Sequence, residues 1–535
     1  MKTSYKVLFS NDTTNTNTCS SPCSPKRTFA KNPQTGKEDY ISPPFTGAML
    51  EASVDETAET GVDVHLLQPG VGWVPWWKSK VYPFEEHIKF MKERTGMDPS
   101  DNSFANYMAN GGDMVEVFCR RCREKKLAPF VSFRLNDVHG HEFVQLPKEE
   151  IPSWAWHAFS PIHVNHPEWR LGDINDWNGK ALDWAMSEVP AFKFAFIREI
   201  IEQYDIDGFE LDFMRNSNFF RQESTTSEQR RGIMNEFVRN VRKELDKRDQ
   251  ADGRHRWLCV RIPAQIACYD PLGIDPEQMV QEGVDMFNLS NTYYTECRGD
   301  FERFRGIVGN DVGVYFELCH TVHQRRPADP KAKYDCTIQR RTTPLMYYTA
   351  AHLAHSRGCD GCSTFNFVYY REHGTGERGP ATEPPFEIHK GIGDPEFCAK
   401  QPQHYFISEG WWALGLDRTP LPATLESGKP LQVRQYLAPP EGGWQHGGRL
   451  RVQTEDDLGD SKWSASLNGV TLEETDDRSE PYDNPYPQLL GEPNEYRAWL
   501  VPTKLLIDGE NEIEITLING MDKTRVLYMD IAIPK

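Results

Sequence analysis

The segment Asp207-Gly-Phe-Glu-Leu-Asp-Phe-Met-Arg215 is the stretch that decides the fold prediction. It is a short apolar strand interrupted by two acidic residues. Alternate side chains of a strand share one face, so the two Phe and the Leu point one way, and Glu210 and Asp212 point the other. The apolar face suits packing against outer helices, which leaves both carboxylates inside a barrel, with Asp212 nearer its C-terminal mouth. Carboxylates are costly there unless they are functional or paired, and the structural alternative is an ion pair with Arg215 or Arg134.

Seven further apolar runs surround this segment at intervals that leave room for helices. The eight predicted strands cover residues 6–10, 62–68, 129–135, 208–214, 257–263, 286–290, 313–318 and 363–367. The helices predicted between them cover residues 47–60, 113–126, 181–204, 227–247, 276–282, 300–308 and 342–355, with an eighth within 395–415. Thr226 and Gln229 form a capping-box pattern at the start of the fourth helix.

Eight alternations of strand and helix predict an α/β fold, a (β/α)8 TIM barrel with long loops after its first three strands. The structural rival is an open doubly wound sheet, which usually shows a glycine-rich phosphate turn after its first strand. Here the first strand runs instead into Asn11-Asp12-Thr13-Thr14-Asn15. We therefore assign residues 1–425 to a catalytic barrel.

The remaining residues, 426–535, have a different pattern of short strands separated by turns such as Asn468-Gly469 and Asn519-Gly520. This composition predicts an antiparallel β-sandwich as an accessory domain. Its strands are expected at residues 431–436, 449–454, 463–467, 498–502, 512–518 and 526–533. The segment GENEIEITLINGM resembles the edge of a jelly-roll module common beside carbohydrate-active barrels.

A second acidic residue, Glu317, ends the predicted seventh strand and is followed by His320. Carboxylates on the fourth and seventh strands of a barrel face each other across its mouth, which is the arrangement that glycoside hydrolysis needs. One carboxyl group protonates the leaving oxygen, and the other attacks the anomeric carbon or activates water. The structural alternative for Glu317 is an ion pair with a cation such as Arg261.

The stretch DGFELDFMR resembles the fourth-strand Asp-Gly-x-x-x-Asp signature of TIM-barrel glycoside hydrolases, in which the strand-4 acid is nucleophile in some families and proton donor in others. Glu317 is similar to the strand-7 nucleophile of the retaining clan that includes β-galactosidases and cellulases. That clan carries Asn-Glu where this chain has Leu211-Asp212. The resemblance implies Asp212 as acid/base and Glu317 as nucleophile, and it leaves the reverse assignment open.

Polar and aromatic residues at the other strand ends are predicted to meet substrate at the same barrel face. Asn, Asp, His and Arg side chains hydrogen-bond sugar hydroxyls, and Arg134 could hold a sulfate or carboxylate bidentately. The predicted substrate-binding residues from the strands and strand ends are Glu210, Arg134, Asn136, His139, His141, Asn11, Asp12, Asn288, Asn366, His320, Arg261 and Tyr293.

Seven of the 14 Trp residues fall in the loops after the second and third strands. Indole faces stack on sugar rings, so Trp73, Trp76, Trp77 and Trp154 join the predicted substrate-binding residues. About two of the seven are expected to touch substrate; the alternative is that loop Trp residues pack the long loops onto the barrel.

The composition of the chain excludes some classes of binding partner. The net charge of −19 argues against nucleic acid and anionic lipid, which need an extended basic surface. No run reaches the ~18–20 apolar residues of a membrane helix. The N-terminus lacks the apolar core of a signal peptide, which favours a cytoplasmic protein, or a secreted or periplasmic one if a leader was removed. No metal or other cofactor is expected, and a homo-oligomer is left open.

Together these features predict a retaining, exo-acting glycoside hydrolase of oligosaccharides, with a sulfated or otherwise anionic galactan as the source suggested by Arg134, Arg261 and Arg371. Two alternatives stay open. One is a metal-dependent carbohydrate deacetylase or hydrolase that uses His139 and His141. The other is a glycan-binding barrel that has lost catalysis.

Overall fold

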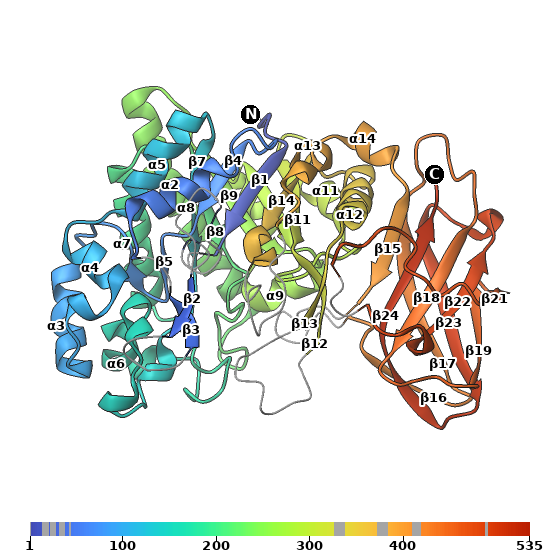
Figure 1. The fold of residues 1–535 in the computed structure, drawn as a ribbon. Coiled ribbons are helices and arrows are strands. Elements are labelled where there is room, and N and C mark those ends of the chain that lie inside the picture. Colours follow the sequence, from blue (N-terminus) through green and yellow to red (C-terminus); the bar gives the residue numbers. More distant parts are fainter. Residues whose placement is uncertain are drawn as a thin grey trace. The chain divides into compact units, whose positions relative to one another are not determined.

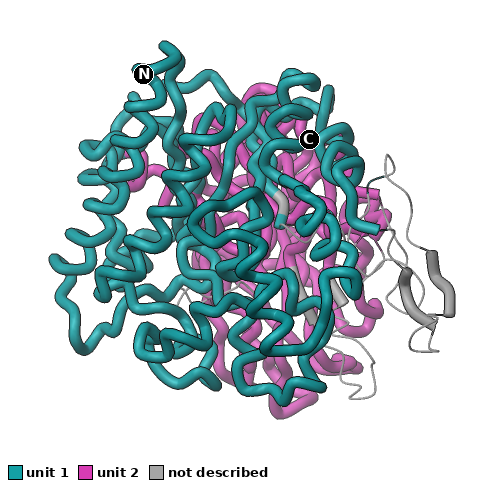
Figure 2. The backbone as a smooth tube through the Cα atoms, turned by 90° about the vertical axis from the view of Figure 1, so that its left-hand side faces the viewer, with its two compact units in different colours: residues 1–288, 306–313 teal, residues 289–305, 314–535 magenta. Residues whose placement is uncertain are grey.

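The computed structural model describes residues 2–12, 16, 21, 28–31, 38–41, 44–325, 338–371, 383–408, 419–486 and 490–535. The chain forms two compact units, coloured separately in Figure 2. Unit 1 contains residues 1–288 and 306–313, and unit 2 contains residues 289–305 and 314–535.

Eight parallel strands close into a barrel in the order β1-β14-β11-β10-β9-β8-β7-β4, which confirms the predicted (β/α)8 fold (Figure 1). Each predicted strand is present within two or three residues of its expected ends. The barrel strands are β1 (Val7–Asn11), β4 (Val64–Leu67), β7 (Ala128–Arg134), β8 (Gly208–Asp212), β9 (Trp257–Pro263), β10 (Met286–Ser290), β11 (Gly313–Cys319) and β14 (Gly361–Phe365).

The register of β7, β8 and β9 stacks the inward-facing side chains in layers. Gly208 lies at the bottom, where a Cβ atom would come within 2.4 Å of the Phe130 ring. One layer above, Ser132, Glu210 and Cys259 are paired across the three strands, and the next layer up holds Arg134, Asp212 and Arg261. Parallel pairing therefore places one arginine on each side of Asp212.

Helices follow the barrel strands as expected. They are α2 (Gly47–Asp55), α5 (Met114–Lys125), α7 (Glu188–Gln203), α8 (Ser227–Asp252), α10 (Pro276–Gln281), α11 (Phe301–Val308), α12 (Pro344–Ser356), α13 (His389–Ile392) and α14 (Pro395–Ala399). The predicted capping box is confirmed, because Thr226 Oγ1 accepts from the Gln229 amide and Gln229 Oε1 accepts from the Thr226 amide.

Helix α7 starts seven residues later than the periodicity predicts. The Asn136 side chain holds the preceding segment out of a helix, because it donates to the Leu182 carbonyl at 2.8 Å and accepts from the Leu182 amide at 3.1 Å. A side-chain amide that satisfies both backbone groups of one residue stabilises an irregular conformation there. The apolar residues Ala181, Leu182 and Trp184 are thus buried loop residues instead of the first helical turn.

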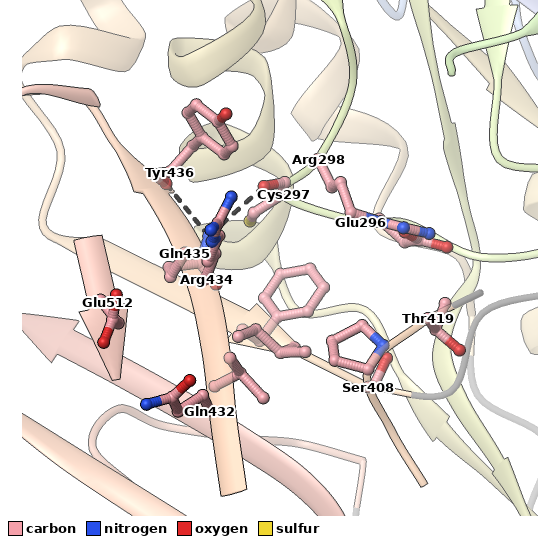
Figure 3. A pocket seen from close by; sticks show the side chains of 14 residues that line it. Glu296, Cys297, Arg298, Ser408, Thr419, Gln432, Arg434, Gln435, Tyr436 and Glu512 are labelled. Atoms are coloured by element: carbon pink, nitrogen blue, oxygen red, sulfur yellow. Dashed lines mark hydrogen bonds and ion pairs between the residues drawn. The ribbon is translucent and has the colours of Figure 1, made fainter. Parts of the chain in front are cut away.

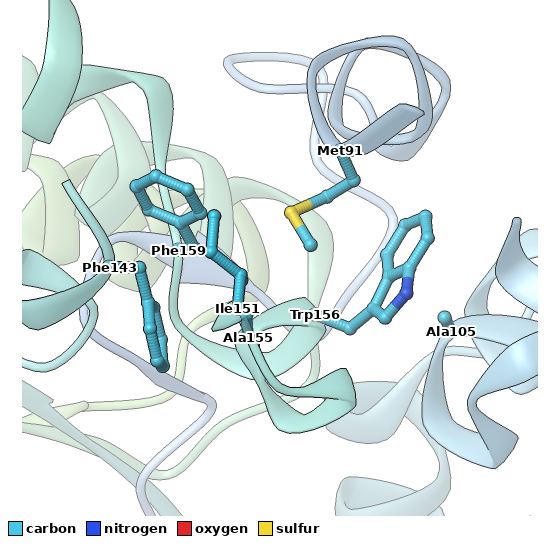
Figure 4. Close-up of a cluster of buried hydrophobic side chains, with 7 residues drawn as sticks. All are labelled: Met91, Ala105, Phe143, Ile151, Ala155, Trp156 and Phe159. Atoms are coloured by element: carbon cyan, nitrogen blue, oxygen red, sulfur yellow. The ribbon is translucent and has the colours of Figure 1, made fainter. Parts of the chain in front are cut away.

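The loops after β4 and β7 carry their own secondary structure and a small core. They contain β5 (Gly70–Val71), β6 (Val74–Pro75), α3 (Phe84–Thr95), α4 (Ser103–Ala109) and α6 (Pro161–Asn165). Figure 4 shows the cluster that joins them, in which Trp156 lies among Met91, Ala105 and Phe159. These loops are therefore packed structure.

Unit 2 contains two antiparallel sheets, which hold the six predicted C-terminal strands together with β15, β16, β20 and β21, which were not predicted. One sheet has the order β15-β24-β18-β22-β21, with β16 also paired to β24, and the other has the order β17-β23-β19-β20. The strands are β15 (Gln403–Ile407), β16 (Ala423–Glu426), β17 (Pro430–Leu437), β18 (Gly448–Thr454), β19 (Lys462–Leu467), β20 (Val470–Thr471), β21 (Glu473–Thr475), β22 (Tyr496–Val501), β23 (Gly509–Asn519) and β24 (Lys523–Ile533). The boundary at residue 426 stays a prediction.

Short elements complete the fold: β2 (Thr28–Lys31) pairs with β3 (Glu38–Ile41), β12 (Thr321–Arg325) pairs with β13 (Ile338–Arg341), and α9 (Tyr269–Leu272) follows β9. Across the described ranges, no helix combines the length and apolar character that crossing a bilayer requires.

Candidate active site

Asp212 is fully buried at the C-terminal end of β8, in unit 1. Its Oδ1 atom accepts from Arg261 Nη1 at 2.9 Å and from the Met214 amide at 2.8 Å, and its Oδ2 atom faces Gln68 Nε2 at 3.4 Å. Both oxygens therefore act as acceptors, and one of the donors is a buried guanidinium. Such an environment suits a charged carboxylate.

Glu210 lies one layer deeper on the same face. Ser132 Oγ donates to its Oε1 atom at 2.7 Å, and Asn288 Nδ2 donates to its Oε2 atom at 3.3 Å. The outward-facing Phe209, directly before Glu210, packs as predicted: its ring stacks on Phe133, which in turn stacks on Phe196 of α7.

A second network surrounds Arg134 at the end of β7. Its guanidinium donates from Nη2 to Asp12 at 2.6 Å and from Nη1 to Asp137 at 3.1 Å. Burial opposes the charge on Asp12, but Arg134, Arg215 and His139 together lower the pKa of this carboxyl group to about 2. Asp12 and Arg134 are 122 residues apart, so only the closed barrel brings them together.

His139 joins this network through both of its ring nitrogens. Its Nδ1 atom bonds to Asp137, and Arg215 Nη2 lies 2.8 Å from its Nε2 atom. Burial opposes ionisation of Asp137, yet His139 and Arg134 hold the pKa of that carboxyl group well below its usual range. The His139 side chain is 27% exposed, so it is the accessible part of the network.

Two predicted residues, Asn136 and His141, have structural contacts in unit 1. The side-chain amide nitrogen of Asn136 donates to the backbone carbonyls of Leu182 and Asn218. His141 is buried against His163, with ring centroids 3.7 Å apart, and burial lowers its pKa to about 4. The described residues contain no group of three or more His, Cys, Asp or Glu side chains placed to hold a metal ion. The ligands named for a metal-dependent enzyme are thus not brought together.

The loop Trp residues are divided by burial. Trp73, Trp76 and Trp77 are buried, and their indole nitrogens donate to Asp137, His157 and Glu199. This placement favours the packing alternative for these three. Trp154 and Trp177 are each 42% exposed, and Trp154 packs edge-on against Phe143.

The remaining predicted residues at strand ends belong to unit 2, apart from Asn11. Glu317 of β11 is buried and accepts from Ser290 Oγ at 2.6 Å. His320 is buried with its ring 5.3 Å from that of Tyr369, and Tyr293 lies 6.2 Å from the Phe365 ring. Asn366 is buried directly after β14, with a left-handed backbone at φ 51°. Asn11 ends β1, and its side chain lies outside the described part of the structure.

Sequence reasoning missed Gln68 and Lys193. Gln68 follows the second barrel strand, as the other predicted residues follow theirs, so its position was a usable signal. Lys193 lies on α7 among buried Val189, Phe196 and Ile200, so a lysine on the apolar stripe of a helix was the signal there.

Unit 2 contains a pocket of about 470 Å³ that no predicted site residue lines (Figure 3). Glu296 to Arg298 form one side, and Gln432 to Tyr436 of β17 form another. Gln435 Nε2 donates to the carbonyls of Cys297 and Tyr436, and Arg298 pairs with Glu296 at 2.8 Å. Residues 409–418, which connect the lining residues Ser408 and Thr419, lie outside the described part of the chain.

The fold and these strand ends define the class of the protein as a (β/α)8 barrel with buried carboxylates at the C-terminal ends of its strands. No protein-family profile matches the chain, and a search of curated proteins found no match.

The similar solved structures include glycoside hydrolases. Alpha-L-fucosidase isoenzyme 1 from Paenibacillus thiaminolyticus is 11% identical with a TM-score of 0.33, covering 88% of this chain and 86% of that one. An alpha-L-fucosidase from Vibrio sp. strain EJY3 is 12% identical with a TM-score of 0.34, covering 90% and 86%. A GH36 alpha-galactosidase from Geobacillus stearothermophilus is 11% identical with a TM-score of 0.33, covering 99% and 55%.

Proposed function

We propose that the protein is a glycoside hydrolase in which Asp212 is one of the two reacting carboxylates. The observation that carries the proposal is the fully buried Asp212–Arg261 ion pair, 2.9 Å long, at the C-terminal end of a barrel strand. Active sites of such barrels are built at these strand ends. A buried ion pair is costly to form and is weak as a source of stability, so a functional role explains its presence better.

The contacts of Asp212 favour the role of nucleophile over that of acid. Arg261, Gln68 and the Met214 amide all donate to it, so a proton on this carboxyl group would displace a donor. A nucleophile must be ionised, whereas the acid must hold a proton near neutral pH. We therefore assign Asp212 as nucleophile and retain Glu317, the sequence prediction, as acid/base. This reverses the preferred assignment of the sequence analysis and keeps the retaining mechanism.

Substrate contacts are proposed for the accessible edge of the Arg134 network. His139 is partly exposed and Arg215 bonds to its Nε2 atom, so a sugar hydroxyl, carboxylate or sulfate that reaches this edge would find donors already oriented. Exposed Trp154 is the proposed stacking residue. Exo-action on oligosaccharides, an anionic galactan as their source and a cytoplasmic location remain part of the proposal.

The experiment starts from a panel of chromogenic α- and β-glycosides and of neutral and sulfated oligosaccharides. On any substrate that is cleaved, Asp212→Gly should abolish turnover, and added azide should restore it with a glycosyl azide of inverted configuration, because a small anion fits in place of the missing nucleophile. Glu317→Gln should lower kcat by about 10²–10⁴-fold, with the smallest loss for activated leaving groups that need no proton.

Glu210→Gln is the matched control, because it removes a carboxylate from the same strand and face, one layer deeper. Glu210→Gln should keep a larger share of the wild-type activity than Asp212→Gly or Glu317→Gln. Azide rescue of Glu317→Ala with a glycosyl azide of inverted configuration, and no rescue of Asp212→Gly, would reverse the role assignment, because rescue of an acid/base variant gives the azide of retained configuration. If Asp212→Gly and Glu317→Gln both cleave substrate at the rate of the unmodified protein, the proposal is overturned. If the unmodified protein binds a glycan but cleaves none, the glycan-binding alternative is favoured.

A further inference from the structure

Lys193 is a buried amine that the proposed reaction does not use. It lies on the barrel-facing side of α7 and is 1% exposed. Its Nζ atom lies 3.5 Å from the centroid of the Trp73 ring and 4.7 Å from that of Phe133. Within the described residues, this nitrogen has no carboxylate in ion-pair range and no hydrogen-bond acceptor. Burying a lysine with aromatic faces as its only partners is costly unless the amine has a task.

A small cavity beside Lys193 contains a second donor without a partner. The cavity has a volume of about 20 Å³ and is lined on its polar side by Gln68, Ser132 and Arg134. Two guanidinium nitrogens of Arg134 bond to Asp12 and Asp137, but the buried Nε–H has no acceptor in the described structure. An amine and an arginine N–H from two residues that line the same small cavity favour a small, negatively charged acceptor.

The amine is able to react as a nucleophile at neutral pH. Burial lowers the pKa of Lys193 to about 7, and the charge of Asp137 opposes that shift only in part. About half of the amine is then neutral at pH 7, whereas an ordinary lysine with a pKa of about 10.4 is neutral in about one molecule in 2,500. Asp137 is the charged group that acts on the amine, and Arg134 is the other charged residue that lines the cavity.

We propose that Lys193 is a carbamylation site that takes carbon dioxide. The neutral amine adds to the carbon of CO2 to form an N–C bond, one C=O π bond becomes a carboxylate oxygen, and the amine loses one proton: R–NH2 + CO2 gives R–NH–COO⁻ + H⁺. The new carboxylate would accept from the Arg134 Nε–H. No oxidant, reductant or further reactant is needed.

The size and lining of the cavity select CO2 over larger electrophiles. A cavity needs about 10–15 Å³ to hold one water, so about 20 Å³ admits a molecule of two or three heavy atoms. Sugar aldehydes are larger, and an imine would leave the Arg134 donor without an anion. CO2 is uncharged and apolar overall, so it suits a cavity that the rings of Trp73 and Phe133 also line. A single buried water that bridges the amine and Arg134 is the competing occupant.

The test uses the full-length protein in 13C-labelled bicarbonate buffer at pH 7.5. Carbamates are trapped by O-ethylation with triethyloxonium ions and located by peptide mass spectrometry, and the unmodified solution is followed by 13C NMR. The matched control is Lys180, whose ammonium also lies over an indole, 4.2 Å from the exposed Trp177 ring centroid, and which lines neither this cavity nor the pocket of unit 2.

We expect the trapped group on Lys193 to rise with CO2 concentration and to exceed that on Lys180 at least tenfold. The carbamate resonance should disappear in Lys193→Met and Lys193→Arg and persist in Lys180→Met. Because the wild-type measurement stands alone, a variant that fails to fold does not remove the test. Equal trapping on both lysines, or none on Lys193 as CO2 is raised, would overturn the proposal and leave a bridging water.

Discussion

Replacing Lys193 with Met should remove a rise of stability with pH that the buried amine imposes. The folded chain holds this amine with a pKa of about 7, whereas in the unfolded chain it titrates near its ordinary value. Between these two pH values the unfolded state binds more protons than the folded state, so stability increases with pH. The amine is a destabilising group at neutral pH, and this penalty shrinks as the solution becomes alkaline.

The size of the effect follows from the two pKa values. With about 7 in the folded chain and about 10.4 in the unfolded chain, the penalty is about 4 kcal/mol at pH 7 and about 2 kcal/mol at pH 9. The wild type should therefore gain about 2 kcal/mol over this interval from Lys193 alone. A Met side chain fills much the same volume without a titrating group, so Lys193→Met should not show this gain.

The assay is urea unfolding followed by Trp fluorescence at pH 7 and pH 9, in buffers purged of CO2 so that the amine stays unmodified. Wild type, Lys193→Met and Lys180→Met are compared. The stability difference between Lys193→Met and wild type should narrow by about 2 kcal/mol from pH 7 to pH 9. A difference that stays constant, or the same narrowing in Lys180→Met, would refute the assignment of a neutral buried amine.

Three further predictions concern stability. Asp530→Ala should destabilise unit 2 by about 1.5–3 kcal/mol in urea unfolding, because buried Arg451 loses the nearer of its two carboxylates, Asp530 at 2.5 Å from Nη2, and keeps Glu480 at 3.0 Å; a loss below about 1 kcal/mol would contradict this. Thr226→Ala should lower the free energy of unfolding by about 1 kcal/mol, because α8 loses its N-cap, whereas Thr226→Ser keeps a capping hydroxyl and should retain most of that stability. Trp156→Ala should cost about 3–5 kcal/mol and increase proteolysis of the loops that this residue joins, and an unchanged cleavage pattern would argue against their packing as one core.

The barrel was predictable because its determinants are local. Alternation of apolar residues over five to seven positions indicates a strand, and the Thr226–Gln229 pair marks the start of α8 within four residues. Helix α7 was predicted seven residues too long, because the apolar residues before Glu188 are buried by a contact with Asn136, 46 residues earlier in the chain. The periodicity of apolar residues indicates that they are buried, but it does not indicate which part of the chain buries them.

The candidate site was predictable in its acidic residues and not in their partners. Asp212 was identified because carboxylates on an apolar strand are rare and costly. Its contact with Gln68 spans 144 residues and its ion pair with Arg261 spans 49, and no local pattern reports either distance. The Trp residues show the same limit, because an indole in a loop packs or binds according to what covers it, and Trp73 is covered by Lys193.

Sequence alone therefore determined the order of strands and helices, the barrel they form and the face of β8 that carries Glu210 and Asp212, since each depends on neighbours within one turn or one pleat. Tertiary structure alone decided which donors surround Asp212, which loop Trp residues remain exposed and that Lys193 is buried without a counter-ion. Those properties depend on desolvation and on distances between residues far apart in the chain, and both exist only once the barrel has closed.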